Sequence, residues 1–234
     1  MPLMAGESFG RGRRISIDIW SDVMCPFCYM SDAQLDHALE QFPHRDAVDL
    51  RFHSFLLMPQ LSKDAVINVV DLLVRERGIS RQQAVSTNAQ IREHANAVGL
   101  EYHFDRAVAT NMRTAHELSH FALGQRRQHH MIQRLFKAHF VDGLNVGDHD
   151  VLVGLAEEIG LDSAAARKAL QSGEFADAVE ADIRQARQLG ITGVPFFVLD
   201  NKYAMSGVQP VEGFLDALNK VWAESAPRPA LADR

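Results

Sequence analysis

The stretch DIWSDVMCPFCYM, residues 18–30, decides the fold that this chain is expected to adopt. It overlaps ISIDIW (15–20), in which apolar and polar side chains alternate and β-branched residues recur, as is typical of a strand. A helix is predicted over 26–41, because apolar side chains recur there at helical spacing and a proline suits the first helical turn. The two cysteines of the stretch therefore lie where a strand is followed by a helix.

The remaining sequence continues this pattern at both ends of the chain. VDLRFHSFLL (48–57) predicts a second strand, parallel to the first because a helix connects the two. Helical periodicity dominates residues 62–189. Strand patterns return at 195–200 and 202–207, separated by turn residues, and a last helix is predicted over 211–224. A βαβ unit and a ββα unit are thus expected to share one sheet.

Within the central block, one helix is expected over 64–78 and a long helical segment over 111–143. Glycines stand where helices are expected to end, as they commonly do at C-termini. These glycines are Gly78, Gly99, Gly143, Gly160, Gly173 and Gly190.

The order of elements predicts an α/β protein with one large α-helical insertion. Residues 14–61 and 190–223 are expected to form a discontinuous sheet-containing domain, and residues 62–189 the insertion. The segments 1–13 and 224–234 are predicted to be disordered tails.

Composition and charge exclude several classes of function. The chain has 234 residues, a net charge of −6 and a pI near 6.0, which argues against nucleic acid or an anionic membrane as partner. No apolar run approaches the roughly 20 residues of a membrane span, and no apolar signal-peptide region follows the basic N-terminus. We expect a cytoplasmic protein.

The CPFC motif carries the chemistry. At a helix N-terminus, unpaired backbone N–H groups and the helix dipole stabilise a thiolate, the species that attacks disulfides. A thiol of pKa about 8.5 is about 3% ionised at pH 7, whereas one of pKa about 6 is about 90% ionised. The spacing puts Cys28 one turn beyond Cys25, where it can resolve a mixed disulfide. We predict Cys25 as the nucleophile and Cys28 as the resolving cysteine.

Two other interpretations of the cysteine pair remain: buried structural cysteines, or half of a metal site. A zinc site of the paired type needs a second Cys/His pair, and there is no second CxxC, so no metal is expected. Residues 116–120, HELSH, match the H-E-x-x-H pattern of zinc proteases. The metzincin continuation fails, since Leu123 and Arg126 stand where Gly and His are required, and we expect an ordinary helix there.

A second motif, ITGVPFFV (191–198), places a proline at the start of an apolar strand. Taken with CPFC after the first strand, it resembles the DsbA-like thioredoxin superfamily, nearest to its cytoplasmic FrnE-like branch. That branch is related to 2-hydroxychromene-2-carboxylate isomerases and kappa-class glutathione transferases. The resemblance extends over residues 15–222 and includes LFKAHFVDGLNVGDHDVLVGLAEEIGLD (135–162).

The resemblance implies a thioredoxin-like fold with a large α-helical insertion and a cis peptide bond between Val194 and Pro195. In such proteins the cis-proline loop packs against the CxxC motif and offers backbone groups of the preceding residue to a bound substrate or glutathione. Pro26, Phe27, Val194 and Pro195 are therefore the candidate substrate-binding residues.

Two positions depart from relatives of the family. Periplasmic oxidants of this kind usually carry a histidine between the cysteines, where this chain has Phe27. We expect a less oxidising protein for that reason. The isomerase and transferase relatives usually have a serine in the first position of the motif, so the presence of both Cys25 and Cys28 favours dithiol chemistry.

Asp22 and Asp18 are candidate proton acceptors, because a carboxylate near a CxxC motif can take the proton of the resolving thiol. The alternative for Asp22 is a turn or helix-capping residue. For Asp18, on the first strand, the sequence does not decide which face it occupies.

The sequence thus predicts a thiol–disulfide oxidoreductase acting on a disulfide- or thiol-containing protein or small molecule, with a homodimer as a candidate assembly. No cofactor is expected, and glutathione is a candidate redox partner or cosubstrate. One alternative is a glutathione-dependent isomerase or transferase acting on an aromatic small molecule. The other is a non-catalytic peptide-binding or chaperone-like protein.

Overall fold

The computed structural model describes residues 14–224. Residues 1–13 and 225–234, which belong to the segments predicted to be disordered tails, lie outside this range. The strands are β1 (Ile15–Ser21), β2 (Val48–Ser54), β3 (Ile67–Asn68), β4 (Val108–Ala109), β5 (Phe196–Leu199) and β6 (Tyr203–Ser206). The α-helices are α1 (Pro26–Gln41), α2 (Val69–Arg77), α3 (Arg81–Ala97), α4 (Arg113–Leu123), α5 (Gln128–Lys137), α6 (His149–Glu158), α7 (Ser163–Ser172), α8 (Ala176–Gln188) and α9 (Val211–Glu224). Two short helical turns are η1 (Arg45–Ala47), a 3-10 helix, and η2 (Ala138–Asp142), a π-helix.

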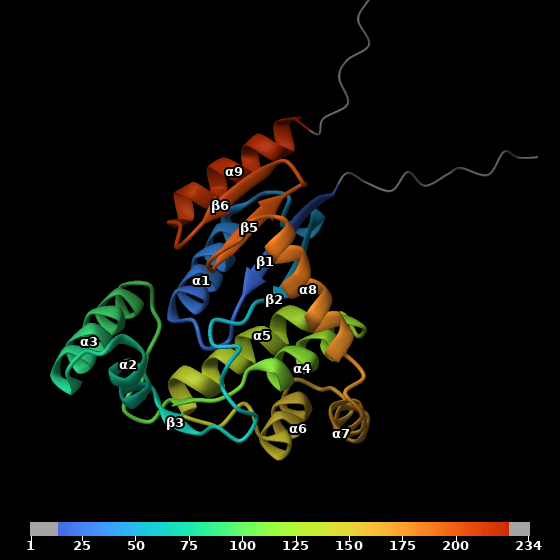
Figure 1. Ribbon diagram of the computed structural model, residues 1–234. Helices are drawn as coiled ribbons and strands as arrows, with labels where there is room; N and C mark the ends of the chain where they lie inside the picture. Colours follow the sequence, from blue (N-terminus) through green and yellow to red (C-terminus); the bar gives the residue numbers. More distant parts are fainter. Residues whose placement is uncertain (1–13, 225–234) are drawn as a thin grey trace, which may run out of the picture.

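Four strands form a mixed sheet in the order β2-β1-β5-β6 (Figure 1). β1 and β2 are parallel, as the connecting helix α1 predicts. β5 runs antiparallel to β1 and to β6. The prediction that the β elements of the two chain ends share one sheet is confirmed.

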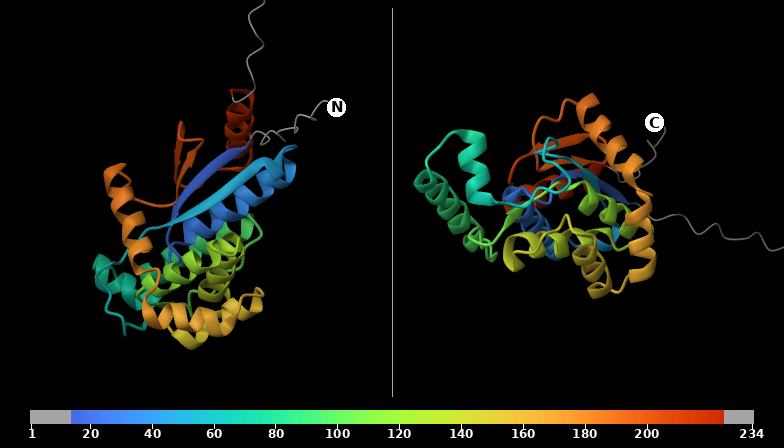
Figure 2. Two further views of the ribbon diagram at one scale, coloured as in Figure 1. Left: turned by 90° about the vertical axis from the view of Figure 1, so that its right-hand side faces the viewer. Right: turned by 60° about the horizontal axis from the view of Figure 1, so that its bottom comes forward.

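The helices cover both faces of this sheet. Ile15, Ile17 and Ile19 of β1 point to the face covered by α1 and α9. Trp20 points to the other face, where it packs against Ala186 of α8. Helices α4 to α7 form a second layer below the sheet, and the pair α2 and α3 projects to one side (Figure 2).

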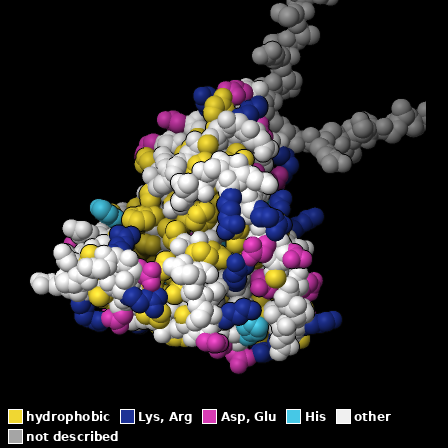
Figure 3. All heavy atoms as spheres, in the orientation of Figure 1, with side chains coloured by type: hydrophobic (Ala, Val, Ile, Leu, Met, Phe, Trp, Pro, Cys, Tyr) yellow, Lys and Arg dark blue, Asp and Glu magenta, His cyan; other side chains and the backbone are white. Residues whose placement is uncertain are grey.

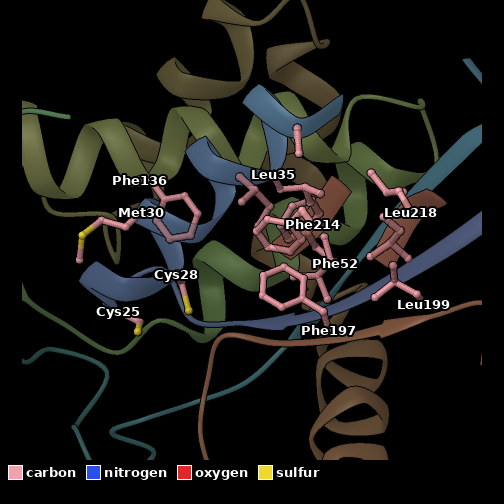
Figure 4. Packing of buried hydrophobic residues seen from close by; sticks show 14 of the residues in the cluster. Cys25, Cys28, Met30, Leu35, Phe52, Phe136, Phe197, Leu199, Phe214 and Leu218 are labelled. Carbon is pink, nitrogen blue, oxygen red and sulfur yellow. The ribbon is translucent and has the colours of Figure 1, made fainter. Parts of the chain in front are cut away.

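The central helices do not form an isolated bundle. Phe136 of α5 and Phe140 of η2 belong to the same buried cluster as Phe197 of β5 and Phe214 of α9. Figure 4 shows several of these side chains around the sheet and α1. A second cluster fills the space between α4, α5, α6 and α7, and Val23, from the loop before Cys25, is one of its members.

Predicted element boundaries were wrong in four places. The strand predicted to reach residue 57 ends at Ser54. The helix predicted over 64–78 begins only at Val69, because Ile67 and Asn68 pair with β4 and Asn68 then caps α2. The segment 111–143 is broken between α4 and α5 and ends in the π-turn η2. Glu224 is the last residue of α9, as predicted for the helix over 211–224, so only the tail boundary at 224 was wrong.

The predicted glycine C-termini are confirmed in backbone geometry. All six of these glycines have positive φ, between 62° at Gly78 and 79° at Gly99 and Gly160. Only glycine adopts this conformation without steric cost, which is why the spacing of glycines located the helix ends.

Because the largest core cluster joins sheet and central helices, we expect residues 14–224 to unfold as one cooperative unit. Phe136→Ala should lower the free energy of unfolding by about 3–5 kcal/mol, the usual effect of deleting a buried aromatic ring. Denaturant unfolding followed by both fluorescence and circular dichroism measures this. The matched control is Val85→Ala on the exposed side of α3, which should change stability little. Separate transitions for the two probes would contradict the expectation.

Candidate functional site

Cys25 is the residue that caps the N-terminus of α1. Its N–H donates to the Asp22 carbonyl at 3.0 Å, and its own carbonyl accepts from the N–H of Cys28 at 3.1 Å. Its Sγ lies 3.7 Å from the carbonyl oxygen of Val194. Cys25 is only 3% exposed and forms no disulfide.

Cys28 lies one turn further along α1 and is equally buried, with its sulfur directed to the same side as that of Cys25 (Figure 4). Burial, followed by the neighbouring Cys25 thiol, raises the pKa of Cys28 well above its ordinary value. The Ser21 side chain and the Asp22 backbone, which hydrogen-bond to Cys28, act in the opposite direction. Cys28 is therefore held as a protonated thiol behind Cys25.

The loop before β5 completes the site. The peptide bond between Val194 and Pro195 is cis, and the Pro195 carbonyl accepts the N–H of Gly207 at 2.9 Å. The register of the sheet pairs Trp20 with Phe196. The residues that follow Trp20 and those that precede Phe196 must therefore meet at one edge of the sheet.

The two residues between the cysteines have different surroundings. Pro26 begins α1, and its carbonyl accepts the hydroxyl of Tyr102 at 2.6 Å. Phe27 is 42% exposed, beside a buried thiol. Leu57, whose N–H donates to Asp22, is also exposed. So is Val208, which follows Gly207. Figure 3 shows hydrophobic side chains gathered on the surface between α1 and the pair α2–α3.

Asp22 is a turn residue and is completely buried. Its carboxylate accepts the N–H of Met24 at 3.2 Å and the N–H of Leu57 at 2.7 Å. It does not cap α1, whose N-cap residue is Cys25. His116 Nε2 lies 3.6 Å from Asp22 Oδ1.

Asp18 lies on the opposite face of the sheet from the cysteines. Side chains of β1 alternate between faces, and Asp18 shares the face of Trp20 and binds His53 at 2.7 Å. We therefore do not retain Asp18 as a proton acceptor for Cys28.

The partner of Asp18 belongs to a buried polar network. Asp182 of α8 binds His53 Nδ1 at 2.8 Å, His120 Nε2 at 2.9 Å and the N–H of Ser54 at 2.8 Å. Burial acts to raise the pKa of Asp182, but hydrogen bonds from His120, His53 and the Ser54 backbone outweigh it and hold that pKa below its ordinary range. This network joins α8 and α4 to β2.

The HELSH segment forms part of α4, as expected, and its histidines do not converge. His116 faces Asp22, whereas His120 faces Asp182. Glu117 instead lines a 980 Å³ cavity with Lys63, Arg113 and His149, and none of the candidate substrate-binding residues lines it. Burial raises the pKa of Glu117.

One group within residues 14–224 has the spacing of metal ligands. Ligand atoms of Asp32, Asp36 and His129 lie within 4.8 Å of one another, where α1 packs against α5. His129 Nε2 is 2.9 Å from Asp32 Oδ1 and 3.6 Å from Asp36 Oδ1. The same distances describe an ion pair between two helices, which accounts for the contact without a metal.

Three neighbours of the CPFC loop were not anticipated from the sequence: Tyr102, which binds Pro26, and two buried histidines near Asp22, His116 and His139. Each comes from the central helical block, more than 70 positions along the chain from Asp22. The HELSH pattern drew attention to His116, but as a metal ligand. No local signal in the sequence marks Tyr102 or His139 as neighbours of the CPFC motif.

Comparisons with known proteins show the family of this chain. The family model of the DsbA-like thioredoxin domain matches residues 16–219. This chain belongs to that family. The uncharacterised protein YwbO of Bacillus subtilis (strain 168) is 31% identical over 188 residues, which are 79% of this chain and 86% of YwbO.

Two solved structures show the same fold. A probable DsbA oxidoreductase from Streptomyces coelicolor is 38% identical, with a TM-score of 0.85 over 93% of this chain and 94% of that one. The cytosolic disulfide reductase DsbM from Pseudomonas aeruginosa, solved with glutathione, is 19% identical, with a TM-score of 0.64 over 89% and 99% of the two chains. The chain is thus a member of a thiol–disulfide oxidoreductase family with a thioredoxin-like fold. No described helix is long and apolar enough to cross a membrane.

The buried network around Asp182 should make the free energy of unfolding of this DsbA-like chain fall both at acidic pH and at pH values above neutrality. Because folding lowers the pKa of Asp182, its ionised carboxylate stabilises the fold at pH values above the ordinary carboxyl pKa of about 4. This stabilisation is lost as the pH falls through the lowered pKa. Burial acts to lower the pKa of His53, but its hydrogen bonds to the carboxylates of Asp18 and Asp182 raise it overall. Its contribution is therefore complete below about pH 6.5 and is lost as pH rises through the raised pKa.

Asp182→Asn should lower the free energy of unfolding by about 3–5 kcal/mol at neutral pH, because it leaves buried histidines without their carboxylate. Denaturant titrations across pH measure both effects. Asp216→Asn on the exposed side of α9 is the matched control. A variant as stable as the unaltered protein, with the same pH profile, would contradict the assigned role of the network.

Proposed function

We propose that this protein is a dithiol–disulfide oxidoreductase with Cys25 as nucleophile and Cys28 as resolving cysteine. The observation that carries the proposal is the position of the Cys25 sulfur, at the N-terminus of α1 and 3.7 Å from the Val194 carbonyl. The N-terminus of a helix is a common place for the nucleophilic cysteine of disulfide exchange. Cys28 supplies a second thiol from the next turn.

The reaction proceeds in two exchanges. The Cys25 thiolate attacks one sulfur of a substrate disulfide, a new S–S bond forms, and the other substrate sulfur leaves as a thiolate. Cys28 then loses its proton and attacks Cys25 Sγ, which releases the second substrate thiolate. Two electrons pass from the protein dithiol to the substrate, and the same steps in reverse oxidise a substrate dithiol.

Asp22 is the candidate acceptor for the proton of Cys28. Its backbone contacts both cysteines, and its carboxylate lies in the same loop, shielded from solvent. A positioned carboxylate can take a proton from a group that becomes a nucleophile.

The substrate is proposed to dock between the cis-proline loop and the exposed apolar side chains. The Val194 carbonyl offers a hydrogen-bond acceptor, and Phe27, Leu57 and Val208 offer apolar contacts. Such a surface suits an extended segment of a disulfide-containing protein. Glutathione, with which DsbM was solved, is a candidate redox partner.

The decisive experiment is the redox equilibrium of the two thiols in glutathione buffers, read by thiol trapping. A reversible two-electron couple between about −120 and −270 mV is expected. Cys28→Ser should accumulate a mixed disulfide with substrate at Cys25, whereas Cys25→Ser should form none. If no disulfide forms at any potential and glutathione still binds, the glutathione-dependent isomerase becomes the better assignment.

The side chain between the cysteines should set the potential. Phe27→His places a cation beside the Cys25 thiolate, which stabilises the reduced form and makes the protein more oxidising. Each pKa unit of stabilisation corresponds to about 30 mV, and the exposure of position 27 limits the rise to about that amount. The measurement is the same equilibrium, with Phe27→Leu as the uncharged control. A lower potential for the histidine variant would contradict the electrostatic account.

A further inference from the structure

Four polar side chains join α1 to α5 at a place to which the proposed function assigns no role. Asp32 and Asp36 are four residues apart on α1, and His129 and Gln133 are four residues apart on α5. Side chains at positions i and i+4 lie on one face of a helix, so each helix presents one pair to the other. The contacts from Asp32 to His129 and from Asp36 to Gln133 each join positions 97 residues apart. No local pattern in the sequence indicates this group.

The polar atoms of the group converge on one ring nitrogen. His129 Nε2 lies 2.9 Å from Asp32 Oδ1 and 3.6 Å from Asp36 Oδ1. The side-chain amide nitrogen of Gln133 lies 3.2 Å from the same ring nitrogen. Around a tetrahedral metal ion with ligand distances of about 2.1 Å, neighbouring ligand atoms are about 3.4 Å apart. The observed distances bracket this value, and stacking against Phe52 fixes the plane of the imidazole.

The buried Asp32 carboxylate has unused acceptor capacity. Its side chain is 3% exposed, and within residues 14–224 its only hydrogen-bond partner is His129. Two other buried carboxylates accept more bonds. Asp22 accepts two backbone N–H groups, and Asp182 binds two histidines and the N–H of Ser54. Because an ionised carboxylate offers about four lone-pair sites, Asp32 can take a further partner.

The charges of the group do not balance. A protonated His129 supplies one positive charge for the two carboxylates of Asp32 and Asp36. No lysine or arginine among residues 14–224 forms an ion pair with either carboxylate. Burial, followed by the neighbouring Asp32, raises the pKa of Asp36, as expected for crowded carboxylates. An ion pair between His129 and Asp32 thus explains how the helices meet, but it leaves the second carboxylate without a cation.

Hydrogen bonds do not satisfy the Gln133 amide in either orientation. Its amide nitrogen donates to Asp36 and also faces His129 Nε2, which itself donates to Asp32 when it carries the proton. Two donors then face each other. Rotation of the amide by a half-turn places its oxygen against the carboxylate of Asp36 instead. A metal ion removes this conflict, because it accepts lone pairs from the imidazole, the amide oxygen and both carboxylates.

We propose that this group binds one divalent transition-metal ion of the zinc type. His129 supplies its Nε2 atom, Asp32 and Asp36 supply carboxylate oxygens, and Gln133 supplies its amide oxygen after the half-turn. The imidazole favours zinc over magnesium and calcium, which take oxygen ligands. The bound ion holds α1, which carries both cysteines, against α5. The site uses neither cysteine, so this inference does not depend on the proposed function.

Titration with Co²⁺ and Zn²⁺ tests the site. Thiolates also bind these ions, so the protein used is the full chain with Cys25→Ser and Cys28→Ser and without a histidine tag. Co²⁺ should bind at one ion per chain with the strong visible absorption of a four-coordinate site, and Zn²⁺ should displace it. His129→Gln should weaken binding by at least about 100-fold, since loss of a group that merely orients a ligand weakens it about 10–100-fold. His130→Gln, at the adjacent exposed position, is the matched control.

A second variant and a stability measurement make the test independent of the histidine. Asp36→Asn, at a side chain that is 37% exposed, should keep the fold and weaken binding by at least about 10-fold. Asp216→Asn on α9 is its control. Zn²⁺ at 100 times its dissociation constant should raise the midpoint of thermal unfolding by about 5–10 °C, and EDTA should reverse the rise. Mg²⁺ should leave the midpoint unchanged.

The results decide between a built site and an adventitious ion. Binding at one ion per chain that is weakened in His129→Gln and Asp36→Asn, and retained in the two controls, supports the proposal. If Co²⁺ does not saturate at one ion per chain, or binds both variants as tightly as the controls, the ion is adventitious and the proposal is wrong. If circular dichroism shows that His129→Gln does not fold, Asp36→Asn alone decides. Because the test protein lacks both thiols, neither result bears on the dithiol mechanism.

Discussion

The structure depends on the burial of strand β1 on both of its faces. Ile15, Ile17 and Ile19 fill the core beneath α1 and α9, while Trp20 packs on the side of α8. Because β1 is also hydrogen-bonded on both edges, its end has a single position in the fold. The antiparallel register with β5 then brings Val194 to the residues that follow β1. The contact between Cys25 and the cis-proline loop follows from this pairing.

The central helices are as important to the site as the sheet. Three successive side chains before Cys25 are packed against residues of the central block. Asp22 faces His116, Val23 is buried in the cluster between α4 and α7, and Met24 packs against Leu61 and Ala109. A loop held at three consecutive positions keeps Cys25 in place without a side-chain cap on α1. The insertion therefore forms part of the wall behind the motif.

Buried polar groups differ in whether they have hydrogen-bond partners. On the face of α8, His53 and His120 share the carboxylate of Asp182, and every member has a close partner. Satisfied networks of this kind hold elements together. Within residues 14–224, His116 Nε2 and both ring nitrogens of His139 lack such partners.

The sequence by itself determined the order of elements, the parallel βαβ unit, the helix ends at glycines and the CPFC motif at a helix N-terminus. These features depend on local periodicity, turn chemistry and spacing, which operate within a few residues. Only the tertiary structure decided which face Asp18 occupies, that Asp22 is a buried turn residue, and that Tyr102, His116 and His139 lie beside the site. Those contacts join residues far apart in the chain, and they result from packing of the helical block against the sheet, which no local pattern encodes.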